Sequence, residues 1–179
     1  MKTIYKKGFT LIEILIAVAI VGIIAAVAFV ALDPAKRFKD SRNAKRWTDV
    51  SAIIEAIKVA QVDDGGQYKG ELQTVLADGA VRMIVTAGAA CAIRALDTDC
   101  DVAIPLVNTC VNLTPYVGGY ISALPEGPTS ADPLRINWNA LANETGYYLQ
   151  KNANGTVTVG SCDGESDLDA VRTVIRIIR

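Results

Sequence analysis

The sequence predicts an α+β protein in which one long N-terminal helix packs on a small antiparallel sheet. Three observations carry this prediction. A long apolar run comes first, a stretch with the periodicity of an amphipathic helix follows it, and strand and turn signals dominate from Tyr68 onward. These changes divide the chain into a basic leader (1–8), an apolar helix (9–32), an amphipathic helix (33–64) and a head (65–179).

The apolar run is long enough to cross a membrane. Residues 9–32 contain a single charged side chain, Glu13. A helix of about 20 apolar residues spans the hydrocarbon core of a bilayer. Lys6 and Lys7 precede the run, and basic residues ahead of a first span favour an N-terminus left in the cytoplasm. We therefore expect a single-pass protein of the cytoplasmic membrane with its N-terminus inside.

Three interpretations of this run compete. The simplest is a plain anchor that carries an external domain. The second is a signal peptide cleaved after Ala28, where Ala26 and Ala28 supply a small-x-small site, although the apolar run before that site is long for a signal peptide. The third begins from Glu13, because a charged side chain inside a spanning segment is costly and usually marks function.

The residues around Glu13 form a compact motif. Lys6 and Lys7 end a short basic leader, Gly8 and Phe9 follow, and Glu13 stands at the fifth position counted from Phe9. This pattern resembles the prepilin processing site of the type IV pilin and pseudopilin family. The resemblance implies that a membrane peptidase cuts after Gly8 and methylates the new amine of Phe9, and that the fold is pilin-like.

The resemblance also implies a structural role and a set of partners. A pilin is not an enzyme; it assembles through its N-terminal helix into a filament at the cell surface or in the periplasm. Its partners are identical or related pilin subunits, the prepilin peptidase, the pilus assembly machinery and cytoplasmic membrane lipids. The rival hypothesis is a membrane-anchored extracytoplasmic binding domain that does not polymerise.

Glu13 is the candidate assembly residue. Phe9 and Glu13 are four positions apart and would share one face of a helix. The carboxylate could pair with the amine of its own chain or with that of a neighbouring subunit. An unpaired buried charge is strongly unfavourable, so pairing between subunits would favour one axial register.

Flexible points are expected where the apolar run ends. Pro34 follows Asp33, so the chain either kinks one long helix or begins a second one there. Gly22 is a weaker point upstream. The resemblance implies a loosened stretch between Gly22 and Pro34 when subunits pack in a filament.

The second half of the helix, from Ala35 to about Asp63, is predicted to pack on the sheet. Apolar side chains recur along it at helical spacing. Its basic segment, residues 36–46, is expected to be mostly a solvated face, with lipid head groups or acidic patches of neighbouring subunits as alternatives. The expected packing stripe consists of Phe38, Trp47, Val50, Ile53, Ile54, Ile57 and Ala60.

The head is predicted to hold short strands and turns. Residues 80–86 read as a strand and residues 112–124 as a short helix. Residues 147–159 read as a hairpin around a turn containing Asn154-Gly155. Residues 171–178 fit either a last strand or a helix.

Four cysteines, Cys91, Cys100, Cys110 and Cys162, all follow the apolar run. None forms a Cys-x-x-Cys motif, and in an exported domain structural disulfides are expected. The favoured pairs are Cys91–Cys100 and Cys110–Cys162.

Composition excludes several other functions. The chain has no histidine, so imidazole-based triads and the commonest transition-metal ligand are absent. A net charge of −1 argues against a general electrostatic grip on nucleic acid. No cofactor is expected. Two acidic runs, at residues 97–101 and 163–169, keep calcium as an alternative, but solvated loop charge is the preferred interpretation.

Overall fold

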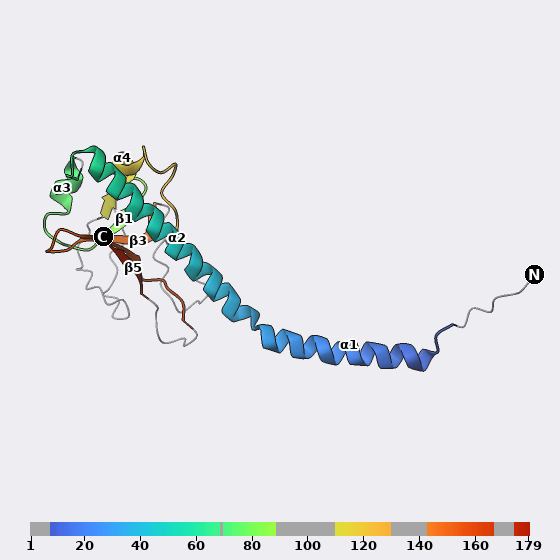
Figure 1. Ribbon diagram of the computed structural model, residues 1–179. Coiled ribbons are helices and arrows are strands. Elements are labelled where there is room, and N and C mark those ends of the chain that lie inside the picture. The colour runs from blue at the N-terminus through green and yellow to red at the C-terminus, as the bar shows by residue number, and fades with distance from the viewer. Residues whose placement is uncertain (1–7, 69, 89–109, 130–142, 167–173) are drawn as a thin grey trace, which may run out of the picture. The chain divides into compact units, whose positions relative to one another are not determined.

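The computed structural model describes residues 8–68, 70–88, 110–129, 143–166 and 174–179 (Figure 1). The chain forms two compact units, Met1–Phe38 and Lys39–Arg179. From here on, the head means the whole second unit rather than residues 65–179 alone. The first unit contains the apolar helix, and the head contains the helical region from Lys39 onward and the sheet.

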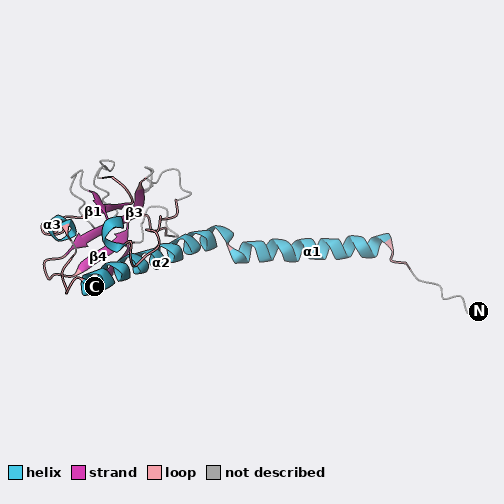
Figure 2. Ribbon diagram, turned by 90° about the horizontal axis from the view of Figure 1, so that it is seen from above, coloured by secondary structure: helices cyan, strands magenta, loops and turns pink. Residues whose placement is uncertain are grey.

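Two helices make up the long helical region. Helix α1 spans Leu11–Leu32 and helix α2 spans Pro34–Asp63, with Asp33 between them (Figure 2). The left-handed backbone of Asp33, with φ of 35°, interrupts the helix. Asp33 then begins α2, because its Oδ1 accepts a hydrogen bond from Lys36 N at 3.3 Å. Of the two alternatives that Pro34 left open, the chain therefore takes the restarted helix.

The sheet is mixed, which corrects the antiparallel prediction. Strand β1 pairs in parallel with β2 and antiparallel with β3, and the remaining pairs are antiparallel. Parallel neighbours need a long crossover, and the insertion between β1 and β2 supplies enough chain for one. The strand order is β2-β1-β3-β4-β5. The strands are β1 (Arg82–Val85), β2 (Cys110–Asn112), β3 (Glu144–Lys151), β4 (Val157–Ser161) and β5 (Ile175–Ile178).

Helix α2 packs on one face of this sheet and forms the core of the head (Figure 1). Val50, Ile53, Ile54, Ile57 and Ala60 are buried, as predicted. The core side chains that they join include Ile84, Tyr147, Leu149, Val157, Val159 and Ile175. Alternate residues of β3 and β4 face the helix, as the two-residue period of a strand requires.

Two members of the predicted stripe do not pack. Phe38 is 65% exposed and Trp47 is 44% exposed. Counting back from Ile54 by helical spacing leads through Val50 to Arg46, so Trp47 falls at the edge of the buried face. Arg46 takes the buried position.

The hairpin is confirmed at the predicted place. Lys151 of β3 is in register with Val157 of β4, and Gly155 adopts the positive φ of 84° that the turn requires. The last segment is a strand rather than a helix, because β5 pairs with β4. The helix predicted over residues 112–124 is shorter, α4 at Thr114–Val117, and helix α3 at Glu71–Val75 was not predicted.

Candidate functional site

A reciprocal pair of side-chain contacts closes the N-terminus of α1. Thr10 is the N-cap, and its Oγ1 accepts a hydrogen bond from Glu13 N at 3.3 Å. Glu13 Oε2 accepts hydrogen bonds from Thr10 N and from Thr10 Oγ1, each at 2.9 Å. This arrangement is a capping box, the Ser/Thr-x-x-Glu device that satisfies donors at the start of a helix. The Glu13 carboxylate is thus satisfied within its own helix.

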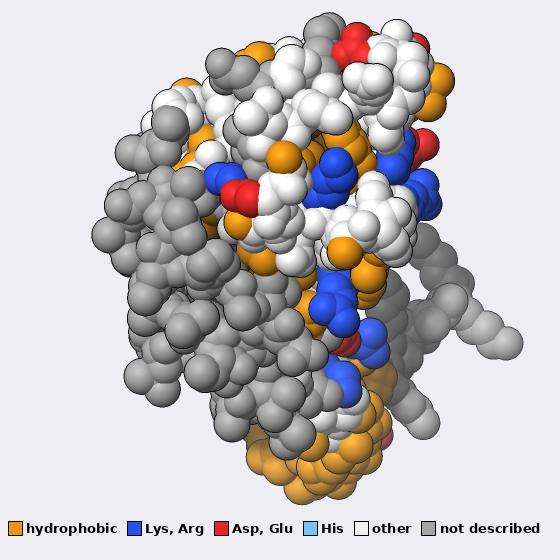
Figure 3. Space-filling view, turned by 90° about the vertical axis from the view of Figure 1, so that its left-hand side faces the viewer, with side chains coloured by type: hydrophobic (Ala, Val, Ile, Leu, Met, Phe, Trp, Pro, Cys, Tyr) orange, Lys and Arg blue, Asp and Glu red, His pale blue; other side chains and the backbone are white. Residues whose placement is uncertain are grey.

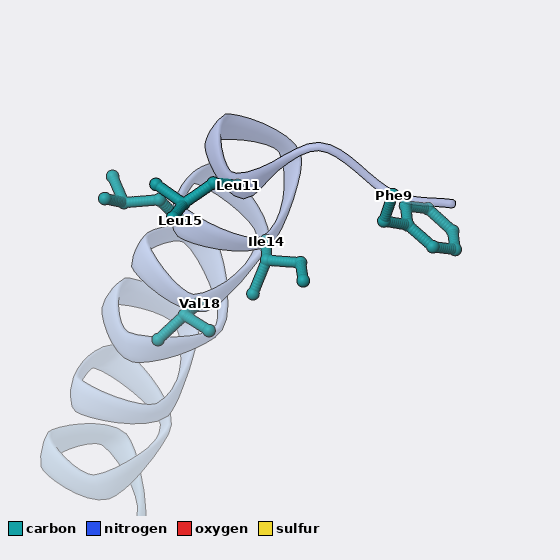
Figure 4. A pocket seen from close by; sticks show the side chains of 5 residues that line it. All are labelled: Phe9, Leu11, Ile14, Leu15 and Val18. Carbon is teal, nitrogen blue, oxygen red and sulfur yellow. The ribbon is translucent and has the colours of Figure 1, made fainter. Parts of the chain in front are cut away.

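Phe9 lies outside the helix. The backbone hydrogen bonds of α1 start with the one from Ile14 N to Thr10 O, at 3.3 Å. The Phe9 side chain is 84% exposed and projects from the segment before the first turn (Figure 4). The prediction that Phe9 and Glu13 share a helix face is wrong for this form of the chain, because the capping box begins the helix after Thr10. Lys6 and Lys7 lie outside the described residues.

The side chain of Phe9 borders an open hollow of about 600 Å³ on the surface of α1 (Figure 4). The other lining residues are Leu11, Ile14, Leu15 and Val18. This lining is hydrocarbon, so the hollow offers no acid, base or metal ligand. It suits contact with lipid or with another apolar surface.

Helix α1 buries none of its side chains. Its sequence, together with its length, makes it the one helix in the described part of the chain that could cross a membrane on those criteria. A fully exposed helix of this composition is not stable in water, because its apolar surface needs a lipid or protein partner. Gly22 lies within the continuous helix, and a Cβ at that position would meet nothing within 4 Å.

In the head, a buried carboxylate holds two arginines of α2. Glu165 Oε1 accepts from Arg42 Nε at 2.6 Å, and the same oxygen lies 3.2 Å from Arg46 Nη1. The Arg46 side chain is fully buried and that of Glu165 is 4% exposed. Burial alone would raise the pKa of Glu165, but the arginines outweigh burial and hold the pKa below its ordinary value.

The segment after β4, which contains Glu165, makes further contacts with α2. Asn43 Nδ2 donates to Glu165 O at 2.6 Å, and Asn43 Oδ1 accepts from Glu165 N at 2.9 Å. Lys39 Nζ donates to Ser166 O at 3.3 Å. The segment after β4 is therefore fixed to α2 through both side chains and backbone.

A second polar contact lies beside this cluster. The Tyr147 hydroxyl donates to Asp49 Oδ2 at 2.5 Å, and Lys45 Nζ lies 2.7 Å from the same oxygen. Burial and the hydrogen bond to Asp49 raise the pKa of Tyr147. This contact ties β3 to α2 at the border of the hydrophobic core.

The basic segment is mostly exposed, as predicted, but Arg42, Lys45 and Arg46 bind groups within their own head and Arg46 is buried. One prediction about charge is wrong, because Glu165 of the second acidic run is buried rather than solvated. Periodicity could have placed Arg46 on the buried face, but nothing in the sequence pairs it with Glu165. On the face shown in Figure 3, several Lys and Arg side chains lie close to one another, and Asp or Glu lies beside some of them.

The predicted Cys110–Cys162 bond is wrong. Both cysteines are disulfide-bonded. Cys110 is in register with Met83, Met83 with Tyr148, and Tyr148 with Gly160, two residues before Cys162. Three strand spacings separate them by about 14 Å, whereas bonded cysteines have Cα atoms within about 7 Å.

The other predicted pair, Cys91–Cys100, lies outside the described residues. None of the described cysteines is free, in agreement with the expectation of structural disulfides.

The described residues contain no cluster of three or more metal-ligating side chains. Residues 97–101 and 167–169 of the two acidic runs lie outside the described part of the chain. Asp163 is buried in the head. Calcium therefore gains no support from the part of the molecule that the structure describes.

Sequence reasoning missed the role of Thr10. The signal was present, because Thr10-x-x-Glu13 ahead of an apolar run is a capping-box pattern. The carboxylate of Glu13 was assigned to the amine of Phe9 or of a neighbouring subunit, and its nearest partner, Thr10, was overlooked.

Residues 5–29 match the family model of the prokaryotic N-terminal methylation motif. No curated protein and no solved structure matches the chain. The matched segment contains the capping box and most of α1. The N-terminus of this chain therefore carries the signature of type IV pilin and pseudopilin prepilins.

Proposed function

We propose that this chain is a prepilin, the precursor of a structural subunit of a type IV pilus or a related pseudopilus. The observation that supports this most strongly is the methylation motif on a fully exposed apolar helix whose acidic residue stands in its first turn. In a water-soluble domain such a helix would expose its apolar surface to water, whereas a subunit that is held in a membrane and later polymerises requires it.

Processing removes the leader. The prepilin peptidase hydrolyses the peptide bond between Gly8 and Phe9, which leaves a carboxylate on Gly8 and an amine on Phe9. The enzyme then methylates that amine. These steps come from the resemblance, and the exposure of Phe9 supports them because the bond is accessible.

Before assembly, α1 anchors the subunit in the cytoplasmic membrane. Lys6 and Lys7 remain on the inner side, and the head lies outside. A disulfide-bonded head fits an oxidising compartment beyond that membrane. The assembly machinery then extracts the subunit from lipid into the filament.

Glu13 changes partner during this sequence. In the precursor its carboxylate accepts from Thr10. Cleavage creates a positively charged amine close by, and a charge-assisted hydrogen bond is roughly twice as strong as a neutral one. In a filament, the carboxylate pairs with the amine of a neighbouring subunit, since an apolar helix bundle makes an unpaired charge very unfavourable.

Mass spectrometry of the protein purified from membranes tests the proposal. We expect the mature chain to begin at methylated Phe9. A chain that retains Met1 would support the plain anchored domain instead. A chain that begins at Phe29 would support a signal peptide, and either result would overturn the prepilin proposal.

A further inference from the structure

The start of α1 coincides with the bond that the prepilin proposal identifies as the cleavage site. The helix begins at Leu11, so the Gly8–Phe9 bond lies just outside it. Thr10 has extended backbone, with φ of −78° and ψ of 152°. The hydrogen bonds between Thr10 and Glu13 hold the boundary at this residue.

This boundary decides whether the bond can reach a peptidase. In a helix, the carbonyls of Gly8 and Phe9 would accept hydrogen bonds from residues four positions later, so they would not be free to bind an enzyme. In an extended segment, both carbonyls and amides are free to pair with an enzyme's main chain, as extended peptides do when they bind along a strand.

The surroundings of the bond are open as well. A Cβ built at Gly8 would meet nothing within 4 Å. Phe9 points away from the helix and is 84% exposed (Figure 4). The segment therefore has an accessible main chain and a large apolar side chain next to the scissile bond.

We propose that Thr10 is a positioning residue for cleavage of the Gly8–Phe9 bond: its capping box with Glu13 stops α1 short of that bond and keeps the segment extended for the peptidase. The proposal rests on the proposed function. Water adds across the bond, Gly8 takes the hydroxyl as its carboxylate, and Phe9 takes the proton as its amine. Thr10 takes no part in the bond-breaking itself.

Four variants of the unprocessed chain separate capping from side-chain recognition. Thr10→Val keeps the shape of threonine and removes the hydroxyl, and Thr10→Ser keeps the hydroxyl. Glu13→Gln still accepts the hydrogen bond from Thr10 N, because Gln also completes a capping box, whereas Glu13→Leu does not. Thr48→Val on α2 is the matched control for a threonine far from the leader.

The measurement is the initial rate of leader removal by prepilin peptidase in mixed membranes, followed by gel mobility and mass spectrometry. Loss of an N-cap changes the equilibrium constant between two positions of the helix start by a factor of about five. We therefore expect Thr10→Val and Glu13→Leu to be cleaved about fivefold more slowly. Thr10→Ser, Glu13→Gln and Thr48→Val should stay within about twofold of the parent.

A structural measurement removes the remaining ambiguity. In micelles, the backbone chemical shifts of residues 8–10 in the uncleaved chain should have values typical of extended backbone. They should move towards helical values in Thr10→Val but not in Thr10→Ser. Parent-like cleavage of Thr10→Val would overturn this inference and leave the prepilin proposal intact. Equal slowing of Thr10→Val and Thr10→Ser would do the same. If the parent chain is not cut between Gly8 and Phe9 at all, the proposed function itself fails.

Discussion

At the scale of single residues, the most informative finding is a carboxylate shared by two arginines. Arg42 and Arg46 lie one helical turn apart, and both contact Glu165 from the segment after β4. A buried arginine without this partner would leave an uncompensated charge in the head. The sequence shows only a basic segment and an acidic run, because the pairing depends on how the chain returns to α2.

Replacing Glu165 by Gln tests this contact. The substitution keeps the size of the side chain but leaves both arginines without a counter-charge, so we expect the free energy of unfolding of the head to fall by about 3 kcal/mol. Chemical denaturation followed by tryptophan fluorescence measures it. The exposed Glu55→Gln on α2 should change it by less than about 0.5 kcal/mol; equal effects of the two variants would contradict a buried ion pair.

The same residue predicts a dependence of stability on pH. Because the pKa of Glu165 is lowered in the folded head, its contribution is fully present above the ordinary value of 4.5 and is lost as the pH falls through the folded pKa. Thermal unfolding should therefore show a decline in stability below about pH 4.5 that Glu165→Gln reduces. An identical decline in both proteins would assign the acid sensitivity to other groups.

At the scale of secondary-structure elements, the features that depend on residues close together in the sequence were predicted, and those that depend on distant residues were not. The periodicity of α2 and the turn of the β3–β4 hairpin depend on neighbouring residues, and both were predicted. The parallel pairing of β1 with β2 depends on a distant insertion and was missed. Trp47 was misplaced because its spacing puts it at the margin of the buried face.

Strand β4 contains a position where only glycine fits. A Cβ at Gly160 would lie 2.6 Å from Tyr148 Cζ and 2.7 Å from Ile175 O, on the two neighbouring strands. We expect Gly160→Ala to lower the free energy of unfolding by about 1–3 kcal/mol. The control is Gly119→Ala, where a Cβ meets nothing within 4 Å. A Gly160→Ala head as stable as the Gly119→Ala head would show that the strands can move apart without loss.

At the scale of the whole molecule, the chain consists of two units whose surfaces differ. The first unit exposes its apolar helix, and the head has a closed core of its own. The motif in residues 5–29 was recognisable from sequence because it is local. The disulfide pairing was not, because strand order decides which cysteines are neighbours.

The order of the strands gives a covalent prediction. Cys110 and Cys162 are both bonded, yet the register sets them three strands apart. Peptide mapping of the unreduced protein should therefore find no peptide pair that joins Cys110 to Cys162. Recovery of that pair as a major product would show that the strand order is wrong.

The role of Glu13 in assembly is the central claim, and Glu13→Gln isolates it. Glutamine still completes the capping box, so the leader should be removed, but a neutral amide cannot form the ion pair with the Phe9 amine. Electron microscopy of material sheared from cells should show filaments for the parent chain and none, or far fewer, for Glu13→Gln, with both proteins beginning at Phe9. Filaments of normal number and length from the processed Glu13→Gln protein would contradict the account.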